Sequence, residues 1–282
     1  MATLKLENVS YTYGAHTPFE IEALRNVTLT VREGSVTGII GHTGSGKSTL
    51  VQLLNGLEKP HGGRVLLDDT DIWQTPKEMQ KIRFRVGLVM QYPEYQLFEE
   101  TVRADIAFGP RNMGLDVNEI ALRVEQAAGF VGLSPELLDK SPFDLSGGEK
   151  RRVAIAGIMA MRPEVLVLDE PAAGLDPRGR DTILCGIRTY GEQTGATVVI
   201  VSHSMEDMAT FCDDVIVMAR GEVFLSGTRD EVFAHATELA SVGLDVPQIT
   251  RLSLLLAERG IALPEGIYTT DAAVSAISKL FQ

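Results

Sequence analysis

The stretch from Gly41 to Thr49 constrains the fold of this chain more than any other feature. It reads, in order, Gly41, His42, Thr43, Gly44, Ser45, Gly46, Lys47, Ser48 and Thr49. This order fits G-x-x-x-x-G-K-S/T, the pattern of a phosphate-binding P-loop. An apolar run at residues 35–40 predicts a buried strand before the loop, and the helical spacing of apolar residues over 48–56 predicts a helix after it. Such a unit gathers backbone N–H groups and the positive end of a helix around an anion, so we expect the chain to bind a nucleoside triphosphate.

Two side chains of this loop have expected roles in binding. Lys47 can reach the β- and γ-phosphates, and the Ser48 hydroxyl can ligate Mg²⁺. The alternative is a glycine-rich turn that carries an incidental lysine. That alternative leaves unexplained why the signals for strand, loop and helix coincide.

The order of apolar runs predicts an α/β fold. Strands are expected at residues 4–13, 24–32, 35–40, 63–67, 86–91, 165–170 and 196–203, followed by a hairpin at 214–218 and 222–226. Helices are expected at 48–56, 177–192, 247–259 and 270–280, with broken helical pieces over 98–161. The alternation of strands and helices indicates a mostly parallel core sheet, and the alternating polarity of the first two strands is typical of antiparallel pairing. The block between residues 91 and 165 is expected to be a helical subdomain inserted into the sheet.

Composition excludes several classes of protein. The net charge of -12, without a basic tract, argues against general nucleic-acid binding. Cys185 and Cys212 are isolated in the sequence and are expected to be reduced structural residues. The first residues show no signal-peptide pattern, and no apolar stretch approaches the ~20 residues that cross a bilayer. We therefore expect a cytoplasmic protein whose link to any membrane comes through a partner.

Two acidic residues end one of the predicted core strands. Asp169 and Glu170 follow the apolar run at 165–168. In P-loop NTPases an acid at this strand end holds Mg²⁺, and a neighbouring carboxylate can orient or deprotonate the attacking water. A solvated surface pair is the alternative. The proline and small residues that follow at 171–174 favour a tight loop instead.

Three further candidates lie at other strand ends. Gln91 can touch Mg²⁺ or the nucleophilic water, His203 can donate a hydrogen bond to the γ-phosphate, and Tyr13 can stack on a base. Each residue, taken alone, is more often an ordinary loop or structural residue. Their shared position at strand ends of a parallel sheet, where such folds bind ligands, favours the functional interpretation.

A second glycine motif, Leu-Ser-Gly-Gly-Glu, occupies residues 145–149. Ser146 is expected to cap a helix, and Gly147 and Gly148 are expected to leave its first amides open to an anion. A plain capped helix explains the serine but not the paired glycines, which cost ~1 kcal/mol each against alanine. Because the P-loop already holds this chain's own phosphates, a second anion site implies a nucleotide shared with another chain.

The P-loop, the Asp169-Glu170 strand end and residues 145–152 together resemble the ATPase subunit of an ATP-binding cassette (ABC) transporter. The resemblance covers roughly residues 4–230. It implies an ABC ATPase fold with ATP and Mg²⁺ as ligands and an N-terminal antiparallel β subdomain. It further implies a nucleotide-binding domain over 1–233, with a helical subdomain at about 92–162, and a C-terminal helical extension over 234–282.

The resemblance also implies roles for single residues. Tyr13 stacks on adenine, and Gln91 is the glutamine of the coupling loop and a Mg²⁺ contact. Asp169 supports Mg²⁺, Glu170 is the catalytic carboxylate and His203 is the switch histidine. In the head-to-tail dimer of this family, Ser146, Gly147, Gly148 and Asp176 act in trans on the nucleotide of the partner. Ala173 stands where many relatives have serine, which leaves any serine contact across the dimer open.

The segment from Gln91 to Phe98 narrows the resemblance. Its Pro-Glu-x-Gln-Leu-Phe pattern is similar to that of energy-coupling factor transporters, which take up vitamins or transition-metal ions. Residues 17–20, 108–110 and 246–249 are similar to the same group. The chain resembles the second ATPase subunit of that group. The implied partners are a sister ATPase, in a heterodimer rather than a homodimer, and a transmembrane coupling protein. Substrate-binding membrane subunits are implied indirectly, and the implied location is peripheral, at the cytoplasmic face of the membrane.

Some alternatives remain open from sequence. Residues 91–100 can form a groove for a partner's helix or a plain surface loop. The tail after residue 234 can dimerise or pack on its own cassette. A soluble ABC ATPase of DNA repair or translation is a competing class, as is a non-hydrolysing ATP sensor. The sensor would be expected to lack Glu170 or His203, and both are present.

Overall fold

The computed structural model describes residues 2–264 and 266–280. The strands are β1 (Leu4–Tyr13), β2 (Ile21–Val31), β3 (Val36–Ile40), β4 (Gly62–Leu67), β5 (Thr70–Asp71), β6 (Val86–Val89), β7 (Val165–Asp169), β8 (Thr197–Val201), β9 (Asp214–Ala219) and β10 (Glu222–Thr228). The helices are α1 (Lys47–Leu54), α2 (Met79–Arg85), α3 (Val102–Asn112), α4 (Val117–Phe130), α5 (Gly147–Met159), α6 (Pro177–Thr194), α7 (Met205–Phe211), α8 (Arg229–Ala234), α9 (Ala236–Ser241), α10 (Gln248–Ala257) and α11 (Thr270–Lys279). The predicted strands and helices are all present, with ends shifted by a few residues. The short elements β5, α2, α7, α8 and α9 were not predicted.

The core sheet has the strand order β10-β9-β3-β8-β7-β6. Neighbouring strands are parallel except for the β9–β10 hairpin, which confirms the expected mostly parallel sheet. Strand β7 shows why both faces are apolar: Leu166 and Leu168 join the core on the helical side, and Val165 and Val167 join the core on the other side. A strand sandwiched in this way reads as a continuous apolar run.

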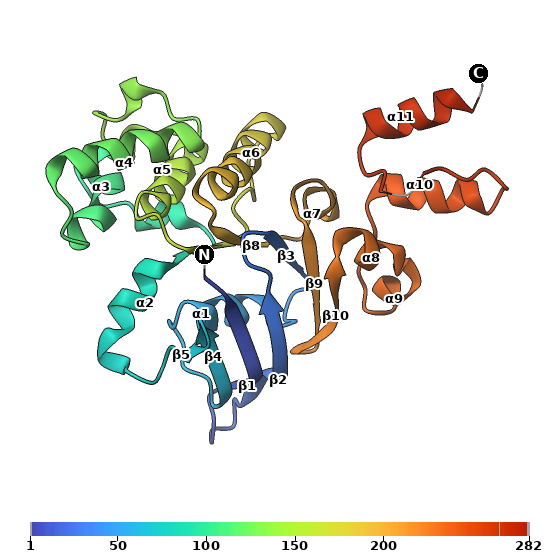
Figure 1. Ribbon diagram of the computed structural model, residues 1–282, viewed down its shortest axis with the longest axis horizontal. Coiled ribbons are helices and arrows are strands. Elements are labelled where there is room, and N and C mark those ends of the chain that lie inside the picture. Colours follow the sequence, from blue (N-terminus) through green and yellow to red (C-terminus); the bar gives the residue numbers. More distant parts are fainter. Residues whose placement is uncertain (1, 265, 281–282) are drawn as a thin grey trace.

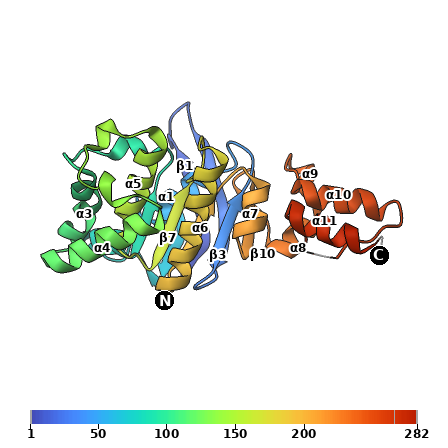
Figure 2. The same cartoon turned by 90° about the horizontal axis from the view of Figure 1, so that it is seen from above.

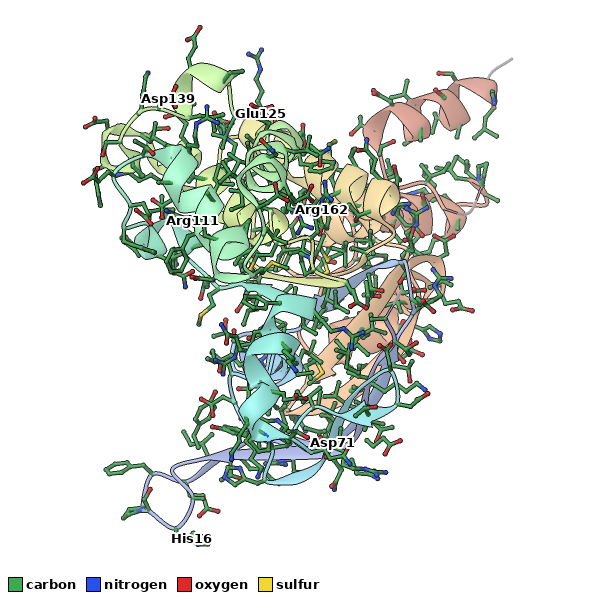
Figure 3. The ribbon with its side chains drawn as sticks, turned by 60° about the vertical axis from the view of Figure 1, so that its left-hand side comes forward. His16, Asp71, Arg111, Glu125, Asp139 and Arg162 are labelled. Carbon is green, nitrogen blue, oxygen red and sulfur yellow. The ribbon has the colours of Figure 1, made fainter. Side chains whose placement is uncertain are left out.

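The N-terminal strands form a second, antiparallel sheet with the order β2-β1-β4-β5. This confirms the antiparallel pairing expected for the first two strands. Strand β4, which the sequence predicted only as a strand, joins the same sheet beside β1. Figure 1 shows this sheet below the core sheet, and Figure 3 places His16 at the far tip of the loop between β1 and β2.

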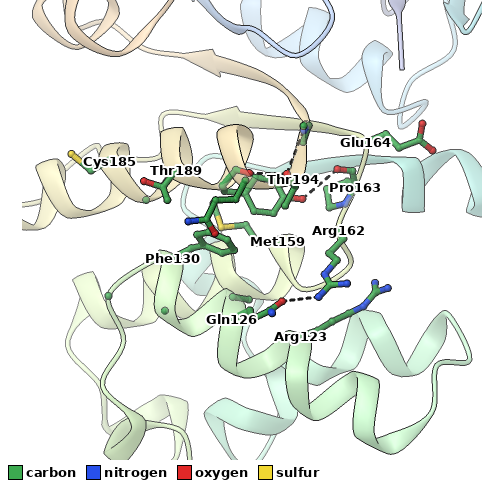
Figure 4. A pocket seen from close by; sticks show the side chains of 18 of the residues that line it. Arg123, Gln126, Phe130, Met159, Arg162, Pro163, Glu164, Cys185, Thr189 and Thr194 are labelled. Carbon is green, nitrogen blue, oxygen red and sulfur yellow. Dashed lines mark hydrogen bonds between the residues drawn. The ribbon is translucent and has the colours of Figure 1, made fainter. Parts of the chain in front are cut away.

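Helices α3, α4 and α5 lie together at one end of the molecule (Figures 1 and 2). Side chains cap each helix at its start: Thr101 accepts from Ala104 N–H in α3, and Asp116 accepts from Asn118 and Glu119 in α4. Helices α4 and α5 pack on α6, and a cavity of about 1010 Å³ opens between the three helices. Figure 4 shows this cavity, with Arg162 bonded to Gln126 on its wall.

The chain after β10 divides into two parts. Phe233 in α8 and Leu239 in α9 are buried in the main core, so this part packs on its own cassette. Helix α10 has no buried residue, and α11 buries only Ala273 among the residues described. Figure 2 shows these two helices at the opposite end of the molecule from α3 and α4. None of the helices in the described ranges has the length and apolar character needed to span a membrane.

Candidate nucleotide-binding site

Glycine residues shape the loop between β3 and α1. Gly46 is the N-cap of α1 and has a left-handed φ of 100°. A Cβ at this position would lie 2.6 Å from the carbonyl oxygen of Ala23 and 2.6 Å from the Leu24 side chain. Only glycine tolerates both this φ and this close approach. Gly44 has a φ of 80° and open space around it, and it lines the cavity in front of the loop.

The Lys47 ammonium is held within the loop. Lys47 is 6% exposed, and its Nζ donates to the carbonyl oxygens of Gly41, at 2.6 Å, and His42, at 3.0 Å. Burial lowers the pKa of Lys47, while the charges of Glu170 and Asp169 raise it. A cation that lines a cavity together with backbone N–H groups is suited to bind phosphate oxygens.

Ser48 and Asp169 come together beside the loop. Both residues line the same cavity. Burial raises the pKa of Asp169, and the nearby Ser48 hydroxyl opposes the rise. Ser45 belongs to the loop itself and is 1% exposed, and its Oγ has no hydrogen-bond partner among the described residues. Hydroxyl and carboxylate oxygens are ligands that Mg²⁺ prefers, and Ser48 and Asp169 offer one of each at the cavity. The residues present therefore fit Mg²⁺ bound together with a nucleoside triphosphate.

Glu170 follows directly on Asp169 but has different surroundings. Its φ of 53° is left-handed, which is uncommon for a residue with a side chain, and its N–H donates to the carbonyl of Val201 at 3.0 Å. One carboxylate oxygen lies 3.3 Å from Nε2 of His203, without the alignment of a hydrogen bond. Burial, and after it the charge of Asp169, raise the pKa of Glu170 to about 7. A carboxylate with a pKa near neutrality is suited to accept a proton from water.

A cavity of about 380 Å³ gathers most of the residues predicted to bind the nucleotide in cis. Its lining comprises Tyr13, Ile21, Glu22, Ala23, Thr43, Gly44, Gly46, Lys47, Ser48, Thr49, Gln91, Asp169, Glu170 and His203. The Tyr13 hydroxyl lies 3.1 Å from Oγ1 of Thr49, and Tyr13 is 40% exposed. Gly41, His42 and Ser45 belong to the same loop but do not line the cavity.

Residues 21–23 at the start of β2 were missed by the sequence analysis. Ile21 pairs with Tyr13 across the β1–β2 hairpin, which brings the start of one strand beside the end of the other. The antiparallel pairing of these strands was itself predicted. This pairing could have shown that the first residues of β2 would lie beside Tyr13.

The residues predicted to act in trans lie outside this cavity. Ser146, Gly148 and Asp176 line a second cavity of about 360 Å³, together with Arg152 and Gly179. Neither cavity is lined by Gly147. Within one chain, therefore, the two predicted sets of residues do not meet.

Ser146 caps α5, as expected. Its Oγ accepts from the Glu149 N–H at 3.3 Å, and the Glu149 carboxylate accepts from the Ser146 N–H at 2.8 Å. This reciprocal capping box satisfies two amides that the helix itself leaves unpaired. The Glu149 carboxylate also accepts from the Ser146 hydroxyl at 2.6 Å.

A buried ion pair joins the segment after Gln91 to α5. The Arg151 side chain is 5% exposed, and its Nη2 and Nε lie 2.9 and 3.1 Å from the two carboxylate oxygens of Glu94. Arg151 also donates to the carbonyl of Ala173. The glutamine segment, α5 and the loop before Asp176 are thus connected through one side chain.

The P-loop, the two acids at the end of β7 and the capped glycine motif define an ATP-binding cassette. The sequence profile of the ABC transporter family matches residues 24–173, and the chain belongs to this family. Its curated relatives include proteins named Energy-coupling factor transporter ATP-binding protein EcfA2. The one from Clostridium tetani is 51% identical over 99% of this chain and 97% of its own length. The one from Clostridium acetobutylicum is 52% identical over 99% of this chain and 98% of its own length.

Solved structures agree with this assignment. The structure of cbiO1 from Clostridium perfringens, described as part of the ABC transporter complex cbiONQ, matches with a TM-score of 0.75 and 41% identity. It covers 88% of this chain and 97% of its own. The ATP-binding cassette MJ0796, solved as a dimer with ADP and Pi, matches with a TM-score of 0.73 and 30% identity, over 80% of this chain and 98% of its own.

These comparisons confirm the resemblance drawn from the sequence motifs. The chain is an ATP-hydrolysing subunit of an ABC transporter of the energy-coupling factor type. The competing interpretations, a soluble cassette of repair or translation and a non-hydrolysing sensor, are not supported. The roles of single site residues and the domain limits stay predictions.

Proposed function

We propose that this chain powers an uptake transporter by closing on ATP together with a second ATPase subunit. The observation that carries the proposal is the separation of the predicted site into two cavities. Lys47 and Glu170 line one cavity, whereas Ser146 and Asp176 line the other. A head-to-tail pair of chains would place each set against the complementary set of the partner. This chain would then offer Ser146, Gly147, Gly148 and Asp176 to the nucleotide held by its partner.

Within its own site, this chain would bind ATP through the P-loop, with Lys47 on the β- and γ-phosphates and Tyr13 stacked on the adenine. Glu170 would accept a proton from the attacking water, and His203, 3.3 Å from Glu170, would contact the γ-phosphate. Gln91 would report the state of this site to the rest of the transporter.

Mg²⁺ would be held by Ser48, Gln91 and Asp169. When bound, the ion neutralises charge on the transferring phosphoryl group. The position of all three residues on the wall of the same cavity supports this assignment.

A groove beside the glutamine segment supports a role for a transmembrane coupling protein. A cavity of about 380 Å³ is lined by residues of the 96–98 segment, α3 and α5. The rings of Phe98 and Phe108 meet edge to face there, 4.9 Å apart, and are 58% and 41% exposed. Exposed aromatic side chains in a groove suit an amphipathic helix of a partner. We infer that a helix of the coupling protein docks here, which favours the groove over a plain surface loop.

The names of the relatives describe ATP-binding proteins of energy-coupling factor transporters, which supports a place for this chain in such a transporter. We infer a sister ATPase as the partner, in a heterodimer, with substrate-binding membrane subunits contacted only indirectly. The chain would lie peripherally at the cytoplasmic face of the membrane. The cargo would be a vitamin or a transition-metal ion, as the Pro-Glu-x-Gln-Leu-Phe pattern at 93–98 suggests.

The first test is purification of the tagged full-length chain from detergent-solubilised native membranes, followed by mass spectrometry. We expect a second ATPase and a polytopic membrane protein in the same complex. Recovery of soluble partners alone, or of ribosomes or DNA, would contradict the uptake function while leaving the ATPase cassette in place.

The second test separates the two halves of the site. Lys47→Ala should weaken nucleotide binding by this chain, because its ammonium binds the phosphates. Ser146→Ala should instead impair hydrolysis at the site completed by the partner. In mixed dimers, a Ser146→Ala defect confined to this chain's own P-loop would rule out the head-to-tail arrangement.

A further inference from the structure

Arg180, in the first turns of α6, reaches across to the segment that carries His203. Its Nε donates to both carboxylate oxygens of Asp207, at 2.8 and 3.0 Å, and its guanidinium also donates to Oγ of Ser204. The Asp207 side chain is only 10% exposed. Burial raises the pKa of Asp207, and the hydrogen bond from Arg180 opposes this rise. The planar fork of arginine fixes the orientation of a carboxylate that it binds in this way.

The backbone of Arg180 belongs to the turn that begins at Asp176. The Asp176 carboxylate caps α6 by accepting from the Gly179 N–H at 2.6 Å. The Asp176 carbonyl accepts from the Arg180 N–H at 2.9 Å. Arg180 therefore moves with the Asp176 loop, which is the loop predicted to face the partner subunit.

His203 depends on its neighbours for orientation, because its own side chain is 55% exposed. Before His203 in the sequence, the Ser202 N–H donates to the carbonyl of Ile39 at 3.3 Å, and Ser202 Oγ accepts from the Ser204 N–H at 3.1 Å. After His203 in the sequence, Ser204 caps α7 by accepting from the Asp207 N–H at 3.2 Å. Arg180 binds the side chains of Ser204 and Asp207, which form this second support.

We propose that Arg180 is a positioning residue for ATP hydrolysis, which links the Asp176 loop to the cap of α7 and thereby holds His203 beside Glu170. The inference rests on the roles proposed above for His203 and Glu170. A displacement of the Asp176 loop by the partner subunit is transmitted through one rigid helical turn to the histidine segment. Through this contact, the position of His203 depends on whether the partner subunit is bound against the Asp176 loop.

The same helix provides a matched control. Arg188 lies two turns further along α6 and donates to Asp213 at 2.8 Å and to the carbonyl of Phe211 at 3.1 Å. The side chains of Arg180 and Arg188 are 35% and 36% exposed. Arg188 lines neither the nucleotide cavity nor the cavity of Ser146. Arg188 also pairs with Glu192 at 2.9 Å, so its removal costs at least as many ion pairs as the removal of Arg180. Of the two arginines, only Arg180 contacts the cap of α7.

The test measures steady-state ATP hydrolysis and nucleotide affinity for the tagged full-length chain in the complex that purifies with it. We expect Arg180→Ala to lower kcat by about tenfold or more, with KM and nucleotide affinity changed less than about twofold, since general acid–base groups contribute at least this much when aligned. Arg180→Lys should recover part of the loss, because it keeps the charge but not the fork. Arg188→Ala should keep a kcat close to that of the unchanged chain.

Three results would overturn the proposal: a kcat for Arg180→Ala within about twofold of the unchanged chain, an equal loss in Arg188→Ala, or a loss confined to nucleotide affinity. If Arg180→Ala does not fold, the same measurements are made on Asp207→Asn. A lowered kcat with unchanged nucleotide affinity would support the proposal, and an unchanged kcat would contradict it. Glu170→Gln is measured alongside. Normal turnover in Glu170→Gln would remove the proposed catalytic role itself, whereas an inactive Glu170→Gln beside a normal Arg180→Ala removes only the positioning role.

Discussion

Asp169 and Glu170 are neighbours in the sequence, yet their carboxyl groups meet different surroundings. Asp169 ends β7 and lines the nucleotide cavity together with Ser48, which suits a metal ligand. Glu170 turns away through a left-handed φ of 53°, and its pKa is raised to about 7. Two carboxylates whose pKa values are set by different environments can take different chemical roles.

Glu170→Gln should keep nucleotide binding but lose turnover by about a hundredfold or more, because the attacking water loses its base. The nucleotide-bound dimer should then persist instead of reopening. Phosphate release and size-exclusion chromatography with ATP measure the two effects. Turnover near that of the unchanged chain would assign the proton transfer to another group.

The activity should also depend on pH through Glu170. Only the ionised carboxylate accepts a proton, and its pKa is raised from 4.5 to about 7. Below about pH 7, kcat/KM is therefore expected to fall about tenfold per pH unit. The free energy of unfolding changes with pH in the opposite direction to the activity. Because the folded state binds the proton of Glu170 more tightly than the unfolded state does, this group stabilises the fold fully below its unfolded pKa, and the contribution is lost as the pH rises through about 7. A kcat/KM profile that stays flat below neutrality would contradict the assignment of Glu170 as the base.

At the scale of secondary-structure elements, the contact between α4 and α6 leaves no room for a side chain. An ideal Cβ built on Gly186 of α6 would lie 1.8 Å from the carbonyl oxygen of Phe130, at the end of α4. The ring of Phe130 meets Tyr190, one turn further along α6, edge to face at 5.4 Å. The helical subdomain therefore rests on α6 through backbone and aromatic contacts.

Gly186→Ala should lower the free energy of unfolding by about 2 kcal/mol or more, because backbone must move to admit the methyl group. Gly129→Ala is the matched control: it lies in α4, and the Cβ that would be added meets no atom within 4 Å beyond its chain neighbours and the backbone of its own helix. That control should be neutral or slightly stabilising, since alanine favours a helix over glycine. Urea denaturation measures both, and equal stabilities of the two variants would show that α6 shifts freely against α4.

At the scale of the whole molecule, the two sheets contribute buried apolar side chains to the core, whereas the end of the tail leaves apolar side chains exposed. One apolar cluster joins the antiparallel sheet, α1 and one face of the core sheet, while another joins the opposite face to the helical subdomain and to α8 and α9. Leu254 and Leu255 in α10 are each 43% exposed, and Val274 in α11 is 57% exposed. Of the two roles that the sequence left open for the tail, apolar side chains exposed on adjacent helices favour dimerisation for its end.

Deletion of residues 247–282 should leave the cassette folded and able to bind ATP, with a change in Tm of only a few degrees, because α10 and α11 bury little in the described chain. The affinity of the chain for its ATPase partner should fall. Thermal unfolding and analytical ultracentrifugation of the complex measure the two quantities. A large fall in Tm with an unchanged partner affinity would mean instead that the tail packs on its own cassette.

The sequence by itself determined the class of fold, the P-loop, the strand-end acids and the capped start of α5. These features are local: strand, turn, helix and cap each depend on residues close together in the chain, and their order along the sheet follows from connection rules. The subfamily pattern at 93–98 was equally readable, because it is a contiguous run of residues.

Only the tertiary structure decided which distant side chains meet. The pair of Arg180 and Asp207, the pair of Arg151 and Glu94 and the contact of Gly186 with Phe130 join residues between 27 and 57 positions apart. The raised pKa of Glu170 is of the same kind, because burial is its largest cause and the burial comes from elements that converge around the residue. Loop closure and packing of several elements set such contacts, and no local pattern encodes them.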